Sequence, residues 1–476
     1  MESSSTTPEV TVRVTEIKVG GLFGLYDHTI RLQRNERITI IHGPNGVGKT
    51  LVLKAVAAFF NGNFAALTLI PFDRLEITVD SGDAVLVQRK PVPSKTGQQR
   101  YAVEVSLRSA SEPDYDLSVP QRIELPEDST RYASTLARSI PGLQQVGADE
   151  FYDSRSGTHL DSEHVIWRFA DHPATPPSFR RRLANLEPAD VRLFRQAINV
   201  FMIETSRLYK VDSSGRAFDN SYSIEDRIVD YAAQLRELIQ QTLASYGRNA
   251  QRLDQTFPHR LISEAVQPLG MDALKQAIKT LDNTQKELAE FGLLEKPSTI
   301  PISDDEPSIE VSKRVALTLF TNDIREKLSV LEPLANRINI FLGSINGKLR
   351  NKQIYISKES GLLAKDMLGT TLPLDQLSSG EQHEIVLAFE LIFNMPKNSL
   401  VLLDEPELSL HVTWQRMFLP ELLAISKTVE FDCIIATHSP FIVGSRTDLL
   451  TLLDADPDVD MPTDNNDADH RKAERD

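Results

Sequence analysis

The first part of the chain alternates apolar and polar positions with the period of β-strands. TVRVTEIKV at 11–19 alternates residue by residue, GGLFG interrupts it, and RITIIHG at 37–43 is a short apolar run that ends in glycine. LVLKAVAAFF at 51–60 has helix-forming composition, and 74–90 with 99–109 form an antiparallel meander whose hairpin lies at Ser81 to Asp83. The pattern predicts strand, turn, strand, loop and helix, followed by a small antiparallel β subdomain.

From about Ser223 the apolar positions recur every three to five residues, which is the period of amphipathic helices. Three such stripes are present: Ile224, Ile228, Tyr231, Leu235, Leu238 and Leu243; Leu274, Ile278, Leu281, Leu288 and Phe291; Ile324, Leu328, Leu331, Leu334 and Ile338. We expect short helices interrupted at Gly247, Pro258 and Pro297, without a long heptad array. The stripes predict a helical insertion that packs within the chain, with an oligomerising surface as the alternative.

The last part of the chain returns to strands. The stretch 352–374 is typical of a hairpin, and it leads into a helix that we expect to run to about Asn394 and to stop at Pro396. The apolar run at 399–410, a helix through Leu423 and the apolar run at 431–440 follow. Strands as continuously apolar as these, alternating with helices, indicate a mainly parallel sheet covered on both faces.

These elements predict an α/β protein with a mainly parallel sheet, an antiparallel β subdomain and a helical insertion. We expect four regions: the first half of the α/β domain with its β subdomain, the helical insertion, the second half of the domain, and an acidic disordered tail. Their predicted bounds are 1–222, 223–347, 348–453 and 454–476.

Composition narrows the class of protein. A formal charge of −15 over 476 residues argues against a surface that binds nucleic acid everywhere, and the basic run Arg180 to Arg182 is more typical of a solvated helix face than of a DNA contact. No run of about 18 apolar residues exists and the N-terminus has no basic, apolar leader, so we expect a cytoplasmic protein without membrane contact. The single cysteine, Cys433, lies in an apolar run and is predicted to be buried.

GPNGVGKT, at 43–50, is a phosphate-binding loop placed between a buried strand and a helix, the context that this motif requires. Its glycines let backbone N–H groups surround phosphate oxygens, Lys49 offers a charge to the β and γ phosphates, and Thr50 can bind Mg²⁺. The predicted nucleotide-binding residues here are Gly43, Pro44, Asn45, Gly46, Val47, Gly48, Lys49 and Thr50.

Further candidate catalytic and metal-binding residues lie at the ends of two later strands. The apolar residues Leu400 to Leu403 place Asp404 at the carboxyl end of a strand, where it can hold a metal ion, and Glu405 beside it can deprotonate an attacking water. His438 ends the next apolar run, where it can contact the γ-phosphate or the water. We therefore predict Glu405 and His438 as catalytic residues, and Thr50 with Asp404 as metal ligands.

A second helix start suited to anions lies in LSSGEQHEIVL, 377–387. Ser379 and Gln382 stand at capping-box spacing just ahead of an apolar run. Ser378 follows Lys49 by 329 residues, so the chain carries two phosphate-seeking helix starts that are far apart in sequence.

Together, GPNGVGKT, LSSGEQ, LLDEPELSLH and ATHSP resemble the Walker A, signature, Walker B with D-loop, and switch-histidine motifs of ABC-type ATPases. The resemblance implies an ABC-type P-loop NTPase head that uses ATP and Mg²⁺. In that family two heads associate head to tail, and the signature of one covers the γ-phosphate held by the other. Carried over, this gives at least a homodimer in which the partner's nucleotide is contacted by the signature residues Ser378, Ser379, Gly380 and Glu381.

Over about residues 12–445 the sequence is similar to stand-alone ATPases of prokaryotic anti-phage systems, such as the PARIS and Septu ATPase subunits and the ATPase part of OLD-type nucleases. Only 38 residues follow His438, too few for the Toprim nuclease of OLD-type proteins. The resemblance implies a sensor or scaffold that answers a phage-derived trigger and controls a separate toxin or nuclease encoded nearby. The alternative is a RecF-like or SMC-like repair ATPase that acts directly on DNA.

Two details stay open in the sequence. Ser206 stands where similar proteins often have a glutamine that contacts Mg²⁺ and water, and Gln144 or Gln145 are alternative positions for that glutamine. Phe23 and Tyr26 could stack on adenine, although packing in the core is the more usual role for aromatic residues beside glycine turns.

Overall fold

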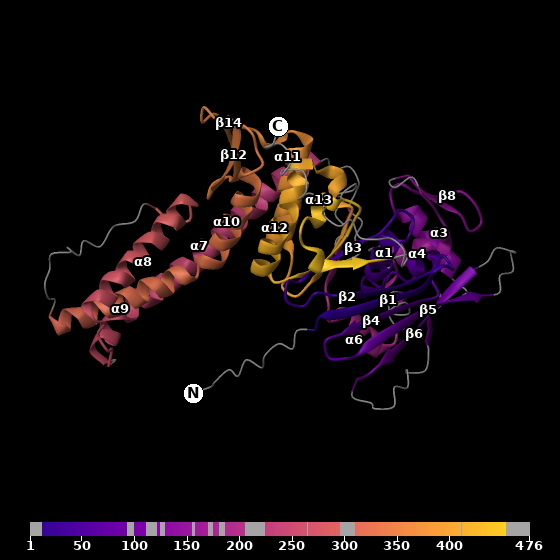
Figure 1. Ribbon diagram of the computed structural model, residues 1–476, viewed down its shortest axis with the longest axis horizontal. Coiled ribbons are helices and arrows are strands. Elements are labelled where there is room, and N and C mark those ends of the chain that lie inside the picture. The colour runs from indigo at the N-terminus through magenta and orange to yellow at the C-terminus, as the bar shows by residue number, and fades with distance from the viewer. Residues whose placement is uncertain are drawn as a thin grey trace, which may run out of the picture. The chain divides into compact units, whose positions relative to one another are not determined.

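The computed structural model describes residues 12–92, 100–110, 121–123, 129–154, 158–169, 175–179, 186–204, 224–263, 265–295, 310–410 and 412–453. The chain divides into two compact units, which are drawn together in Figure 1. The first unit comprises Met1–Phe218, Asn398–Leu408 and Asp432–Asp476, and the second comprises Asp219–Lys397 and Ser409–Phe431. No helix among the described residues is long and apolar enough to span a membrane.

A five-stranded, all-parallel sheet forms the centre of the first unit, in the order β11-β15-β16-β3-β17. Its strands are Val200–Glu204, Leu400–Asp404, Asp432–Thr437, Ile38–His42 and Leu450–Leu452. Nearly every residue of β3, β15 and β16 is buried, which confirms the continuously apolar strands that the sequence predicts. Cys433 is buried in β16, as predicted, and burial raises the pKa of its thiol.

A six-stranded antiparallel sheet, in the order β2-β1-β4-β5-β6-β7, forms the predicted β subdomain of this unit. Its strands, in that order, are Tyr26–Arg31, Val14–Leu22, Arg74–Val79, Ala84–Val92, Arg100–Arg108 and Gln121–Ile123. The hairpin between β4 and β5 turns at the predicted residues. Strand β2 was not predicted, although its alternate residues His28 and Ile30 are buried.

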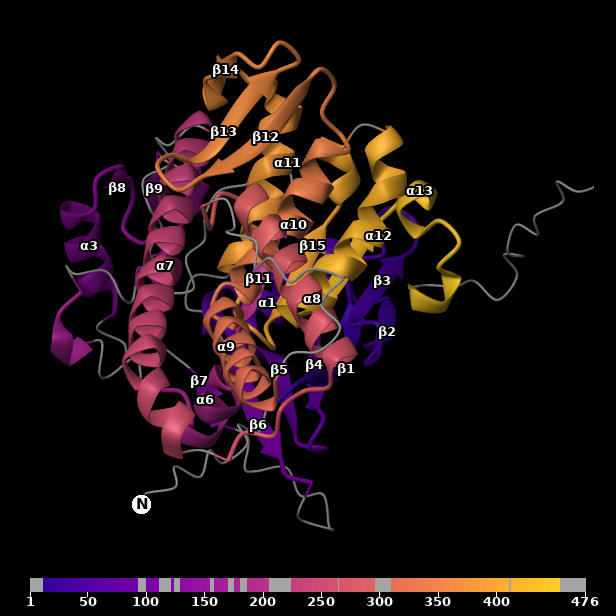
Figure 2. The same ribbon diagram turned by 90° about the vertical axis from the view of Figure 1, so that its left-hand side faces the viewer.

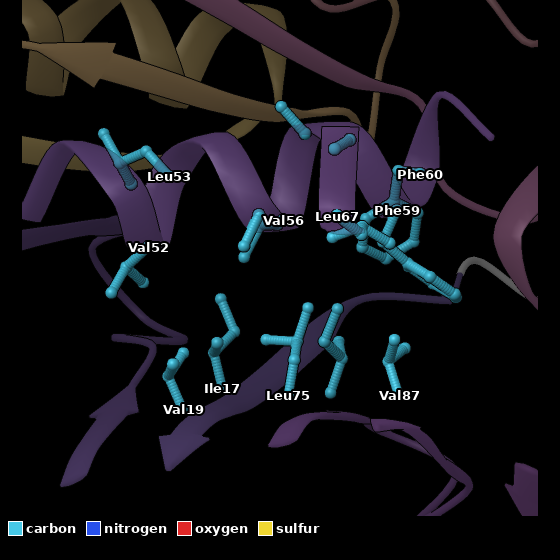
Figure 3. Packing of buried hydrophobic residues seen from close by; sticks show 14 of the residues in the cluster. Ile17, Val19, Val52, Leu53, Val56, Phe59, Phe60, Leu67, Leu75 and Val87 are labelled. Atoms are coloured by element: carbon cyan, nitrogen blue, oxygen red, sulfur yellow. The ribbon is translucent and has the colours of Figure 1, made fainter. Parts of the chain in front are cut away.

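Helix α1, Lys49–Phe60, lies between the two sheets. Val52, Val56 and Phe59 pack against Ile17 and other apolar side chains of β1, β4 and β5 (Figure 3). The same cluster includes residues of β15 and β16, so α1 is apolar around most of its circumference, as expected of a fully buried helix. This burial holds the helix that starts at Lys49 firmly in place.

Smaller elements complete the first unit. Strands β8, β9 and β10 form a three-stranded sheet with its own apolar cluster against α3 and α4. The bounds of these and the remaining elements are α2 Phe64–Leu69, α3 Ser129–Ser139, β8 Leu143–Gln145, β9 Phe151–Asp153, β10 Thr158–Leu160, α4 Ser162–Arg168, α6 Ala189–Gln196, η3 Pro406–Ser409, α13 Pro440–Val443 and η4 Thr447–Leu449.

The second unit contains the predicted helices, with two corrections. Helix α7, Ile224–Ser263, is a single helix of 40 residues that continues through Gly247 and Pro258, so the predicted interruptions there and the expectation of only short helices are wrong. Arg260 donates to both carboxylate oxygens of Asp323 at 2.6 and 2.7 Å, which ties α7 to α9 beyond the proline. Pro297 lies outside the described residues.

Helices α8, Met271–Glu290, α9, Val311–Ser329, and α10, Glu332–Asn346, follow α7. Helix α9 packs against both α7 and α8 (Figure 1). The third apolar stripe does not lie on one helix, because α9 ends at Ser329 and α10 starts at Glu332.

The predicted hairpin of the second unit is the sheet β12-β13-β14, with bounds Lys352–Ser357, Gly361–Asp366 and Thr371–Leu372. Strand β13 packs against α7 (Figure 2). At Gly361, φ is +73° and a Cβ atom would lie 1.9 Å from the carbonyl oxygen of Ala232, so only glycine allows this approach. The last elements are η1 Leu374–Gln376, α11 Ser379–Phe389, the π-helical turn η2 Glu390–Asn394 and α12 Val412–Val429.

Candidate functional site

The parallel sheet brings the predicted site residues of the first unit to one edge. Strand β16 pairs with β3 on one side, where Thr437 lies opposite His42, and with β15 on the other, where Ala436 lies opposite Asp404, so the three strands end within one residue of each other. The phosphate loop leaves β3 at this edge, and Glu405 and His438 directly follow β15 and β16. Ligands gather at the carboxyl ends of strands in such sheets.

Two glycines shape the phosphate loop. Gly46 and Gly48 have φ of +90° and +93°, a conformation that other L-residues rarely adopt. A Cβ atom on Gly48 would lie 2.2 Å from the side chain of Leu22, whereas one on Gly46 would meet nothing within 4 Å. Gly48 is thus required by conformation and by space, and Gly46 by conformation alone. Pro44, Asn45 and Gly46 are exposed, while Gly43 and Val47 are buried.

The Lys49 side chain folds across its own loop. Its Nζ atom donates to the carbonyl oxygens of Gly43 at 2.7 Å and of Pro44 at 3.0 Å, and lies 3.2 Å from Nδ1 of His438. Burial lowers the pKa of Lys49, and nearby carboxylates oppose this effect. A phosphate group can replace the loop carbonyls as the acceptor for the ammonium group.

His438 lies between Lys49 and Glu405. Because lysine only donates, Nδ1 of His438 must accept, which places the proton of a neutral ring on Nε2. Nε2 lies 3.3 Å from Oε1 of Glu405. The predicted histidine therefore contacts both the phosphate-loop lysine and the predicted base.

Glu405 has a left-handed backbone with φ of +47°, which is unusual for a residue with a side chain. Its N–H donates to the carbonyl oxygen of Ala436 at 2.8 Å, and this bond ties the turn to β16. Backbone strain of this kind costs about 1–3 kcal/mol and often marks functional sites.

The predicted metal ligands contact each other: the hydroxyl of Thr50 donates to Oδ1 of Asp404 at 2.9 Å. Among the described residues, no group of three or more His, Cys, Asp or Glu side chains could hold a metal ion alone. This donor set fits Mg²⁺, which usually takes one or two protein oxygens and completes its shell with phosphate and water.

Glu407 was not predicted as a site residue, yet it shapes the turn after β16. Its Oε1 atom accepts hydrogen bonds from the hydroxyl of Thr437 at 2.8 Å, from the N–H of His438 at 2.7 Å and from the N–H of Ser439 at 3.1 Å. These bonds fix the backbone that carries His438. The sequence feature that could have identified Glu407 was its position as an acidic residue two places after Glu405.

Two further histidines near the loop were missed. His28 of β2 is buried, and its Nε2 lies 2.9 Å from the carbonyl oxygen of Val47. It therefore connects the phosphate loop to β2. His42 is the last residue of β3, and β3 pairs with β16 at Thr437. Burial lowers the pKa of His42, and the charge of Lys49 lowers it further, which favours the neutral ring.

The four signature residues belong to the second unit, whereas the constellation around Lys49 belongs to the first. Ser378, not Ser379, is the N-cap of α11, and its capping-box partner is Glu381 instead of Gln382. The predicted box was one residue too late because Gln382 is buried and donates to the carbonyl oxygen of Asp375 at 3.0 Å. Ser378 and Ser379 are exposed, and Gly380 and Glu381 are half-buried.

The open details resolve only in part. Phe23 is 44% exposed on a turn with φ of +57°, so its predicted core packing is wrong, whereas Tyr26 does pack against the core. Gln144 and Gln145 lie on β8, outside the sheet that carries Asp404. Ser206, Arg180 to Arg182 and the acidic tail lie outside the described residues.

Comparison with known proteins gives one family. The family model described as "AAA domain, putative AbiEii toxin, Type IV TA system" matches residues 38–444, well over half of the chain. No curated protein sequence matches.

Among solved structures, the chain is similar to the Smc head domain of Pyrococcus furiosus bound to the C-terminal domain of ScpA, with 13% identity, 91% of each chain covered and a TM-score of 0.32. It is also similar to the SMC head domain of Thermotoga maritima, with 12% identity, 90% of this chain and 91% of that chain covered, and a TM-score of 0.29. Because both TM-scores are below 0.5, neither likeness says anything about the function of this chain.

The two loop glycines give a matched test of the phosphate loop. We expect Gly48→Ala to lower the free energy of unfolding by roughly 2–4 kcal/mol, because it combines left-handed strain with overpacking against Leu22. Gly46→Ala should cost only about 1–2 kcal/mol, since it adds strain without a clash. Urea unfolding followed by circular dichroism measures both, and equal costs would contradict this account of the loop.

Glu407 gives a second prediction. We expect Glu407→Ala to leave the hydroxyl of Thr437 and the N–H of His438 without their acceptor, at about 1–3 kcal/mol for each. The N–H of Ser439 keeps a second acceptor, the hydroxyl oxygen of Thr437 at 2.9 Å. The amide of His438 should then exchange hydrogen faster, and the amide of Ser439 should change less. Glu407→Gln, which keeps one acceptor oxygen, serves as the control and should show a much smaller change. Unaltered exchange at both amides in Glu407→Ala would show that Glu407 does not hold this turn.

Proposed function

The chain belongs to this AAA-domain family, and on that premise we propose that it hydrolyses ATP with Mg²⁺ at sites that two copies of the chain complete together. The proposal rests on one observation. Three segments that are distant in sequence bring five side chains into hydrogen-bond or ion-pair contact at one edge of the parallel sheet: Lys49, Thr50, Asp404, Glu405 and His438. A loop of N–H groups, a lysine, a hydroxyl–carboxylate pair and a second carboxylate are the parts that phosphoryl transfer to water requires.

Each residue has a distinct role in the proposed reaction. The backbone N–H groups of the loop and the N-terminus of α1 bind phosphate, and Lys49 adds a positive charge. Thr50 and Asp404 would hold Mg²⁺, which neutralises phosphate charge when it is bound. Glu405 accepts a proton from the attacking water, while His438 orients Glu405 through Nε2.

The signature residues are assigned to the nucleotide of a second copy. Ser378 and Ser379 are exposed at the N-terminus of α11, where N–H groups and the helix dipole favour an anion. Their own unit contains none of the phosphate-loop residues. A head-to-tail homodimer would bring each α11 to the other copy's γ-phosphate, as the resemblance to ABC-type ATPases implies.

We further propose that this ATPase is a cytoplasmic sensor or scaffold in anti-phage defence and that it controls a separate effector, a toxin or a nuclease. The family description, which refers to a toxin and to a toxin–antitoxin system, supports a place in a defence system of this kind. The closed, ATP-bound pair would be one state of the switch and the state after hydrolysis the other, and the effector would be held or released according to the state.

The predicted base can be tested directly. Glu405→Gln keeps the size of the side chain but removes the base, so ATP should still bind while hydrolysis slows by roughly a hundredfold or more. Turnover assays and the nucleotide retained after gel filtration measure both effects. Asp404→Ala is the companion variant that should lose Mg²⁺-dependent turnover, and near-normal turnover in both would overturn the ATPase proposal.

The same variant tests effector control. ATP that is not hydrolysed stabilises the closed pair by mass action, so an effector governed by that pair should be locked in one state. Cell growth with the neighbouring gene present would then differ between Glu405→Gln and wild type. If growth is unaffected while turnover stops, hydrolysis does not control a toxic effector.

If each site is shared by two copies of the chain, two inactive variants should complement each other. Ser378→Arg should bind ATP without hydrolysing it, because the large cation blocks the surface that meets the other copy's phosphate. Lys49→Ala should lose nucleotide binding at its own loop. A mixture of the two variants should regain activity, since each mixed pair has one loop and one signature that are both intact. Normal hydrolysis by Ser378→Arg alone would rule out the shared site.

A further inference from the structure

Two lysines reach the signature helix α11 from one short segment of the second unit. This segment, residues 348–352, follows α10, the last helix of the insertion, and ends at the first residue of β12. Lys348 lies 2.6 Å from Glu384, and Lys352 lies 2.9 Å from Glu381. The two glutamates are three residues apart on α11, so they lie on the same side of the helix.

Lys352 acts on the N-terminus of α11 through Glu381. Oε2 of Glu381 accepts from Lys352 and also from the N–H of Ser378 at 2.8 Å, while the hydroxyl of Ser378 accepts from the N–H of Glu381. Burial alone would raise the pKa of Glu381, but these hydrogen bonds outweigh burial and lower it. The lysine thus holds the carboxylate that completes the capping box around Ser378.

Lys348 joins α11 to α12 in the interior. Its side chain is only 3% exposed and lies 2.7 Å from Glu421 of α12 as well as 2.6 Å from Glu384, which is 6% exposed. Burial alone would lower the pKa of Lys348, yet the two carboxylates outweigh it and raise the pKa, so the ammonium group stays charged. Helix α10 packs against both α11 and α12, so this ion cluster lies where the insertion meets the signature helix.

The other end of α11 is also tied to the insertion. Tyr231 of α7 hydrogen-bonds to Glu390, and its ring stacks on Phe389 with 4.5 Å between centroids. Glu390 begins the π-helical turn that ends the helix, and such turns are frequent at functional sites. The insertion and the segment directly after it therefore contact the signature helix at both ends.

We propose that Lys348 and Lys352 are positioning residues, through which the helical insertion sets the orientation of the Ser378 N-terminus toward the nucleotide of the second copy. This inference rests on the proposed function. A shift of α10 moves both lysines, and with them Glu381 and Glu384, so an event at the insertion changes hydrolysis in the neighbouring copy. The partner in this coupling is a second copy of the chain.

A purely structural role would not need these charges. Replacing a buried ion pair with apolar side chains is often neutral or stabilising, and a partly exposed pair such as Lys352 with Glu381 adds little stability. The two ion pairs contribute to the orientation of α11, because each fixes one carboxylate of this helix at a defined place. Lys352 is accordingly the better residue to test, because its removal leaves the buried cluster intact.

The test compares Lys352→Met with Lys358→Met, an exposed lysine in the turn of the same hairpin, and with the conservative variant Lys352→Arg. Lys352→Met should fold and bind ATP like the wild type, while kcat falls roughly ten- to hundredfold, as expected of a misplaced catalytic surface. Lys358→Met should keep wild-type kcat, and Lys352→Arg should recover much of the loss. Wild-type kcat in Lys352→Met would overturn the inference.

Mixing experiments separate positioning from damage elsewhere. Lys352→Met mixed with Lys49→Ala should regain activity, because its own phosphate loop then meets an intact signature. Lys352→Met mixed with Ser378→Arg should not, since both signatures are impaired. If Ser378→Arg recovers with Lys49→Ala but Lys352→Met does not, the positioning role is wrong while the shared site stands. If neither recovers, the shared site fails and this inference fails with it.

Discussion

The pairing of β16 with both β3 and β15 is the contact on which the rest of the protein depends. It joins residues 38–42, 400–404 and 432–437 in one register, and it does so with strands that are buried along almost their whole length. Burial leaves charged side chains only at the ends of these three strands, and parallel strands end at the same edge. The phosphate loop, the acidic pair and the histidine meet there because each stands at the carboxyl end of one of these neighbouring strands.

The site is held by a second layer of polar contacts at that edge. Glu407 fixes the turn of His438, His28 supports the loop at Val47, and the turn at Glu405 is tied to β16 through Ala436. These groups need not touch a nucleotide to matter, since positioned dipoles and charges lose little energy to reorganisation during a reaction. The left-handed backbone of Glu405 is stabilised by the same surroundings.

The second unit exposes the N-terminus of one helix, α11. An exposed N-terminus offers unpaired N–H groups to an anion, but it needs support from behind if its direction is to be defined. The structure supplies that support with charge as well as apolar packing: Lys352 at the cap, the Lys348 cluster below it, and Tyr231 at the far end. Two of these anchors follow α10 and one lies on α7, so the signature helix is held by contacts with the insertion and with the segment after it.

The sequence by itself determined the class of fold and predicted most of the candidate site, because both rest on local signals. Apolar runs predicted β3, β15 and β16, and helical periodicity predicted a helical region with other helix bounds than those of α7 to α10. Motifs and strand ends predicted Lys49, Thr50, Asp404, Glu405 and His438 as site residues. Tertiary structure alone decided which helix breakers are tolerated, since α7 continues past Pro258 where Arg260 pairs with Asp323 of α9. It also decided that Phe23 is exposed, that Ser378 is the cap, and that Glu407, Lys348 and Lys352 support the site. Those roles arise from contacts between residues distant in sequence, and no local pattern encodes such contacts.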